Sequence, residues 1–155
     1  MLSFLGEFDC KMDSKGRVML PSALVRQVPS ETENKFVINR GFENCLNIYP
    51  KTEWTKITED IKKLNQYVKK NREFIRRLLN GATEVTLDSS NRLLIPKRLS
   101  ERIKLNKDVV LVSHLNKIEL WDRETYDKMI DSDTEDFADL AEDVMGNKNE
   151  EATNE

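Results

Sequence analysis

The chain has 155 residues, of which 38% are hydrophobic and 34% are charged, and its formal net charge at pH 7 is −3. This length suits one compact domain or two very small ones, and two halves of this size should share a core because each alone buries too little surface. No apolar run reaches the roughly 20 residues that a membrane helix needs, and the N-terminus has no basic-then-apolar signal pattern. We therefore expect a soluble, cytoplasmic protein without a membrane partner.

Charge is distributed unevenly along the chain. Residues 1–130 carry 24 Lys and Arg against 18 Asp and Glu, whereas residues 131–155 carry one Lys against ten acidic residues. A basic body with an acidic tail predicts a polyanionic partner for the body.

Two cysteines and one histidine restrict the chemistry available. Cys10 and Cys45 have no second cysteine at metal-ligand spacing, and although the two can form a disulfide, we expect free, buried thiols. With His114 as the one histidine, no zinc site can be assembled, so we expect no metal or other cofactor. His114 follows a buried-looking strand, and the scattered glycines form no phosphate loop. We therefore expect neither an enzyme nor a small-molecule substrate.

Residues 5–24 are predicted to form a strand, a turn, a second strand and a short helix. The stretch 5–12 alternates apolar and polar residues, which is typical of a strand. In the turn that follows, the Asp13 side chain can accept hydrogen bonds from the backbone ahead of it, and Gly16 can adopt a positive φ at no steric cost. Pro21 ends the second strand and suits the first turn of a helix, where its missing N–H is not needed.

This sequence phrase occurs twice. DSKGRVMLPSAL at 13–24 and DSSNRLLIPKRL at 88–99 share an aspartate, an arginine, a proline and a leucine at the same spacing, 75 residues apart. Asn91 replaces Gly16 in the second copy, and asparagine is the non-glycine residue that best tolerates a left-handed φ. Because the residue type changes while the required geometry is kept, we interpret the two copies as one structure used twice.

The duplication extends beyond these phrases. Segments 36–54 and 109–126 match in their apolar and aromatic residues, so each half is predicted to contain two strands, a short helix, two more strands and the entry to a helix. Between the halves, apolar residues at spacings of three and four predict a first amphipathic helix over 54–68 and a second that ends before Gly81.

The paired phrases resemble the signature of the MraZ family, whose two tandem SpoVT–AbrB-type units each carry Asp-x-x-x-Arg, an apolar run and a proline. The chain matches this signature in both halves, at Asp13, Arg17 and Pro21 and at Asp88, Arg92 and Pro96. The resemblance covers about residues 5–130. It implies an α+β fold, a duplicated swapped-hairpin (AbrB-like) β-barrel with pseudo-twofold symmetry. We expect repeats at 7–53 and 82–125, linking helices at 54–81, and an acidic, partly disordered tail at 131–155.

The resemblance also implies a function, a transcriptional regulator that binds double-stranded DNA. We expect an autoregulatory repressor of the division and cell-wall operon, associated with the nucleoid, that binds direct repeats in the promoter region as a ring-shaped homo-oligomer. The alternative is a ring-forming scaffold whose partner is a protein. The salt dependence of binding separates the two hypotheses. Binding to DNA weakens steeply as the salt concentration rises, whereas salt-insensitive capture of a protein favours the scaffold.

The signature residues have two interpretations from the pattern alone. Each Asp–Arg pair can be an ion pair that only stabilises its turn, or the arginine can contact phosphates or guanine edges. The resemblance favours DNA contact by Arg17 and Arg92, supported by the turn residues Asp13, Gly16, Asp88 and Asn91. Lys15 and Arg26 are further DNA-binding candidates whose counterparts in the second half are not basic. We therefore expect the first repeat to be the better DNA reader.

The acidic tail has two possible roles. Phe137, Leu140, Ala141 and Val144 predict a short amphipathic helix before a disordered end. A mobile tail can occupy the basic face as a DNA mimic, which predicts that deleting residues 131–155 tightens non-specific DNA binding at low salt. Alternatively, the helix docks on the ring and the remaining acidic residues serve only solubility.

Overall fold

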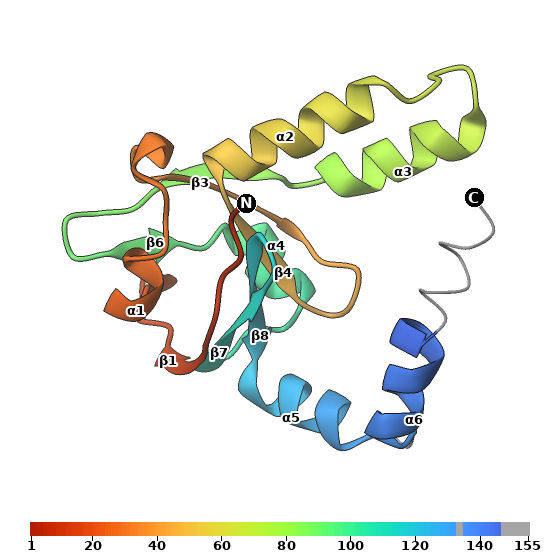
Figure 1. Ribbon diagram of the computed structural model, residues 1–155. Helices are drawn as coiled ribbons and strands as arrows, with labels where there is room; N and C mark the ends of the chain where they lie inside the picture. The colour runs from red at the N-terminus through yellow and green to blue at the C-terminus, as the bar shows by residue number, and fades with distance from the viewer. Residues whose placement is uncertain (133–134, 147–155) are drawn as a thin grey trace.

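The computed structural model describes residues 1–132 and 135–146 and contains two antiparallel sheets flanked by helices (Figure 1). The larger sheet has six strands in the order β1-β7-β8-β4-β3-β5, and β2 pairs with β6 in a separate ribbon. The strands are β1 (Glu7–Lys11), β2 (Arg17–Met19), β3 (Lys35–Arg40), β4 (Leu46–Pro50), β5 (Thr83–Thr86), β6 (Arg92–Leu94), β7 (Asp108–His114) and β8 (Lys117–Asp122).

Short helices follow the ribbon strands, and longer helices follow the central strands. The helices are α1 (Ser22–Val25), α2 (Lys51–Lys62), α3 (Lys69–Leu79), α4 (Lys97–Arg102), α5 (Arg123–Asp131) and α6 (Phe137–Ala141), with a 3-10 turn η1 (Ser30–Thr32) and a π turn η2 (Glu142–Gly146). In Figure 1 the ribbon strand β6 lies at the left, while α2 and α3 form an antiparallel hairpin that extends to the upper right. The element order predicted for each half is confirmed.

Each half of the chain pairs its first strand with the other half. β1 pairs with β7, placing Phe8 opposite Leu111, and β5 pairs with β3, placing Val85 opposite Phe36. β2 pairs with β6, and β4 pairs with β8 at the centre of the large sheet. Because each first hairpin bonds across to the other half, the predicted duplicated swapped-hairpin fold is confirmed.

The strand register reveals the pseudo-twofold axis. Val18 and Leu93 hold the same position in the two phrases and pair with each other in the ribbon. Asn47 and Glu119 hold equivalent positions in β4 and β8 and pair with each other in the large sheet. A residue can pair with its own equivalent only on a twofold axis, so the axis passes through both pairs.

One hydrophobic core joins the halves. It includes Val18, Leu24, Phe36, Ile38, Leu46 and Ile48 from the first half and Leu93, Leu99, Val109, Leu111, Ile118 and Leu120 from the second. Two smaller clusters lie under the longer helices and contain equivalent ring pairs, Tyr49 with Trp54 and Trp121 with Tyr126, whose centroids are 5.6 and 5.5 Å apart. Neither half can bury this surface alone, which explains why both copies lie in one chain.

The first linking helix is shorter than the sequence pattern predicts. α2 ends at Lys62, and Val68 is 43% exposed as the residue that caps α3, so the prediction of one helix over 54–68 is wrong. The cause is local. The Asn65 side chain accepts the N–H of Tyr67, and the Asn65 backbone carbonyl accepts an N–H of the Asn71 side-chain amide. These hydrogen bonds stabilise a turn in place of a further turn of helix.

The predicted tail helix is present as α6, but it changes to a π turn after Ala141. The remainder of the tail, which the sequence predicted to be disordered, lies outside the described residues.

Candidate nucleic-acid interface

Each signature aspartate organises its own turn. One carboxylate oxygen of Asp13 accepts the backbone N–H groups of Lys15 and Arg17 at 3.0 and 2.9 Å, and the other accepts Nε–H of Arg17 at 2.8 Å. Asp88 repeats this arrangement with the N–H groups of Ser90 and Arg92 at 2.8 and 2.9 Å and Arg92 Nε–H at 2.9 Å. The aspartates therefore both close the turn and orient the guanidinium, the two supporting roles that the sequence suggested.

The turn residues Gly16 and Asn91 join the two copies. Both have positive φ, 82° and 59°, as the substitution of glycine by asparagine predicted. The Gly16 carbonyl accepts the N–H of Ile95 at 2.9 Å, and the Asn91 carbonyl accepts the N–H of Leu20 at 2.8 Å. Each turn is thus bonded to the end of the other copy's strand, which fixes the positions of the two arginines relative to each other.

Arg17 and Arg92 lie on the same face of the β2–β6 ribbon. Arg17 pairs with Leu94 and Met19 pairs with Arg92, whereas Val18 and Leu93 between them are buried in the core. Successive side chains of a strand point to opposite faces, so all four residues at the outer positions face away from the core. Met19 and Leu94 are each 54% exposed. The ribbon therefore presents two diagonal arginines and two diagonal apolar side chains.

The ribbon arginines keep their terminal nitrogens available. Within the part of the chain that the structure describes, Nε is the only guanidinium nitrogen of Arg17 and of Arg92 that has a partner, and that partner is the aspartate of the same turn. Their side chains are 26% and 31% exposed. A guanidinium held at Nε can still form a two-pronged contact through its terminal N–H groups with a phosphate or with the O6 and N7 atoms of guanine.

One known protein family matches this chain at two places. The model of a family described as "MraZ protein, putative antitoxin-like" matches residues 3–77 and 78–148. The protein named Transcriptional regulator MraZ from Flavobacterium psychrophilum is 46% identical over 152 residues, which is 97% of each chain. Proteins of the same name from Christiangramia forsetii and Cytophaga hutchinsonii are 44% and 40% identical and cover 95% and 90% of this chain and 96% and 92% of their own.

The chain belongs to the MraZ family. The two matches confirm the tandem arrangement that the paired phrases suggested. They also correct its extent, because the second match continues to residue 148 and includes most of the segment that sequence inspection left outside the resemblance. Helices α5 and α6 of this family member thus follow β8 as α2 and α3 follow β4.

The other predicted DNA-binding residues lie beside the ribbon or apart from it. Lys15 is exposed at the tip of the first turn and lines a groove of about 630 Å³ together with Leu94 and Lys97. Arg26 is exposed at the end of α1 and does not line this groove. Met19 and Leu94 were missed by sequence inspection. Their signal was the alternation of the ribbon strands, but three residues are too few to show which face is buried.

Hydrogen bonding holds both signature aspartates in the charged form. The backbone N–H of Arg17 lowers the pKa of Asp13, with further contributions from the Arg17 side chain and the Lys15 N–H. The backbone N–H of Arg92 lowers the pKa of Asp88 in the same way. At neutral pH both carboxylates therefore remain ionised acceptors for the arginines.

The cysteines are free and unsuited to nucleophilic chemistry. Cys45 is buried, and this burial raises the pKa of its thiol to about 12. Cys10 is only half-buried, so the expectation of two buried thiols holds for Cys45 alone. The partial burial of Cys10 also raises the pKa of its thiol. His114 is exposed at the end of β7. A protonated thiol is a poor nucleophile, so neither cysteine has the environment of a catalytic one.

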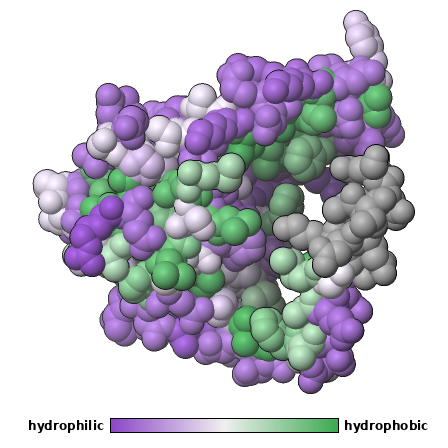
Figure 2. Space-filling view, viewed as in Figure 1, coloured by the Kyte–Doolittle hydropathy of each residue, from purple (hydrophilic) through white to green (hydrophobic). Residues whose placement is uncertain are grey.

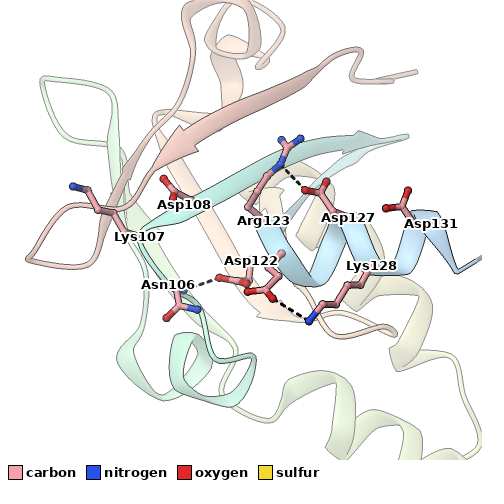
Figure 3. A pocket seen from close by; sticks show the side chains of 9 residues that line it. Asn106, Lys107, Asp108, Asp122, Arg123, Asp127, Lys128 and Asp131 are labelled. Carbon is pink, nitrogen blue, oxygen red and sulfur yellow. Dashed lines mark hydrogen bonds and ion pairs between the residues drawn. The ribbon is translucent and has the colours of Figure 1, made fainter.

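A charged cavity of about 410 Å³ lies beside α5 (Figure 3). Several of its polar groups pair with their neighbours. Asp122 accepts the N–H of Asn106 at 2.9 Å, Arg123 pairs with Asp127 at 3.2 Å, and Lys128 pairs with Glu124 at 3.0 Å. These contacts describe a solvated polar surface on which many of the charges are paired. Among the described residues, no cluster of potential metal ligands forms, and no helix is long and apolar enough to cross a membrane.

Proposed function

We propose that this chain is a transcriptional regulator that binds double-stranded DNA sequence-specifically with its β2–β6 ribbon. The observation that carries the proposal is the placement of Arg17 and Arg92 on one outward face, each held at Nε, with terminal nitrogens that no described residue binds. A two-stranded ribbon fits the major groove of B-DNA, where arginine reads guanine and apolar side chains contact the thymine methyl group. Met19 and Leu94 supply the apolar contacts.

The two halves of the ribbon differ chemically. Lys15 at the first turn corresponds to Ser90 at the second, and Met19 corresponds to Leu94. We propose that the first repeat, with Lys15 and with Arg26 nearby in sequence, contacts DNA more strongly. Several copies in a ring then read direct repeats spaced by about one helical turn, roughly 10 bp. The relatives are named transcriptional regulators. From the family resemblance we further propose that the target is the promoter of the division and cell-wall operon, which the protein represses autogenously on the nucleoid.

A second candidate function is a ring-forming scaffold that binds another protein. The exposure of Met19 and Leu94 favours it, because apolar side chains on a surface also suit a protein partner. In that case Arg17 and Arg92 only stabilise their turns and do not contact DNA.

Selection of bound duplexes from a random DNA pool, followed by titration at several salt concentrations, separates the two functions. The proposed regulator enriches one repeated motif, and its affinity for that motif falls steeply between about 50 and 200 mM salt. Failure to enrich any motif, together with salt-insensitive capture of a protein, would establish the scaffold instead.

A further inference from the structure

The acidic segment 136–146 carries apolar side chains that are largely exposed among the residues that the structure describes. The Asp136 side chain accepts the N–H groups of Ala138 and Asp139 at 2.9 and 3.2 Å, so α6 has an ordered start. Yet Phe137 is 83% exposed, and Val144 and Met145 are 63% and 64% exposed. Among the described elements, only η2 packs extensively against α6. Clustered apolar side chains in water indicate a surface that is covered by a partner.

The hairpin of α2 and α3 has a groove of suitable chemistry. Its volume is about 250 Å³, and its lining residues are Arg40, Gly41, Phe42, Phe74, Arg77 and Leu78. Phe42 is 79% exposed and Phe74 is 43% exposed. Figure 2 shows apolar side chains along the hairpin, on the side that faces the hollow between the hairpin and the α5–α6 region. No residue of 136–146 lines this groove in the same chain.

The groove contains two arginines, Arg40 and Arg77, and no carboxylate among its lining residues in the described part of the chain. Burial lowers the pKa of Arg40, and the nearby charges of Arg102 and Arg77 lower it further. Within the described residues, neither Arg40 nor Arg77 forms an ion pair. Repulsion between close guanidinium groups is relieved when carboxylates enter the site.

The two helical regions have opposite charge and equivalent places in the fold. Residues 51–80 carry nine Lys and Arg against four Asp and Glu, and residues 123–146 carry two against nine. α2 and α3 follow β4, and α5 and α6 follow β8, so the pseudo-twofold axis relates the two regions. A surface at one place that complements a different surface at another produces head-to-tail contact between copies.

We propose that residues 136–146 of one copy dock into the α2–α3 groove of a second copy. Phe137 packs against Phe42 and Phe74, and the acidic side chains around it neutralise Arg40 and Arg77. The inference rests on the part of the proposed function that assembles copies of the chain, and it is independent of DNA contact. It assigns the tail the docking role that the sequence left open, in place of the role of DNA mimic.

Disulfide trapping between two full-length variants tests the proposal. Phe42→Cys places a thiol in the groove and Ala138→Cys places one beside Phe137, both with Cys10→Ala to remove the half-buried native thiol. We expect little covalent dimer from either variant alone under mild oxidation and abundant dimer from their mixture. Absence of dimer from the mixture overturns the proposal. So does a chain with both substitutions that forms the disulfide only within itself.

Charge reversal gives an independent readout in the absence of DNA. Arg77→Glu should raise the dissociation constant for assembly by about tenfold, and Asp139→Arg in the same chain should restore it. The matched control is Lys70→Glu, on the same helix but outside the groove. Light scattering that shows equal assembly for Arg77→Glu and the control contradicts the docking contact. If the chains assemble but the disulfide between copies does not form, only this docking contact is rejected. DNA binding by the same variants tests the proposed function separately.

Discussion

At the scale of single residues, two aspartates orient two arginines. Asp13 and Asp88 each accept two backbone N–H groups and one Nε–H, so each arginine side chain is held beside its own turn on the ribbon face. The sequence predicted the turn-closing role because an aspartate at the start of a tight turn can accept hydrogen bonds from the backbone ahead of it. It did not predict that both arginines share a face, since that depends on pairing between strands that are far apart in sequence.

Acid titration should reveal the two aspartates. Because their pKa values are lower in the folded chain than the ordinary 3.8, they stabilise the fold above that pH, and this stabilisation is lost as the pH falls through the folded values. We expect the free energy of unfolding to fall below about pH 4 more steeply in the wild type than in Asp13→Asn/Asp88→Asn. Denaturant unfolding from pH 6 to pH 2.5 measures this, with Asp60→Asn as the control. Parallel curves for wild type and double variant would contradict the prediction.

At the scale of elements, we propose that the ribbon contacts the bases, and its apolar side chains should then recognise thymine methyl groups. In a selected duplex, replacing the contacted thymine by uracil removes one methyl group. We expect wild-type affinity to fall about threefold to fivefold, the value of one buried methyl. Met19→Ala should bind the duplex more weakly than wild type. At the thymine that Met19 contacts, replacement by uracil should no longer weaken binding by this variant, whereas other thymines should keep their effect. If uracil at every position leaves wild-type binding unchanged, these side chains do not read thymine.

Element order could be predicted from the sequence far better than element pairing. Tight turns, proline stops and apolar alternation are local signals, and they located the strands and short helices of both halves. The exchange of β1 and β5 between halves has no local signal and was predicted only through the family resemblance. The end of α2 was missed because the apolar spacing continues to Val68 beyond the point where Asn65 forms a turn.

At the scale of the whole molecule, repeated copies of one ribbon should bind repeated DNA sites. Inserting about 5 bp between two direct repeats rotates one repeat to the opposite face of the duplex, while the bases of each site remain intact. We expect affinity to fall sharply because the second contact is no longer intramolecular, and a further 5 bp should restore much of it. Gel shifts across this spacing series provide the measurement. Equal affinity at all spacings would mean that a single copy accounts for binding.

The proposed function depends on contact between the ribbon arginines and DNA. The direct measurement is the affinity of Arg17→Ala and Arg92→Ala for a selected duplex, measured by fluorescence anisotropy. The control is Lys63→Ala, on the turn between α2 and α3, which also removes one positive charge. We predict that each arginine variant loses about 1–3 kcal/mol of binding free energy, with Arg17→Ala losing more, while the control stays near wild type and light scattering shows unchanged assembly. Wild-type affinity in both arginine variants would show that the ribbon arginines do not contact DNA.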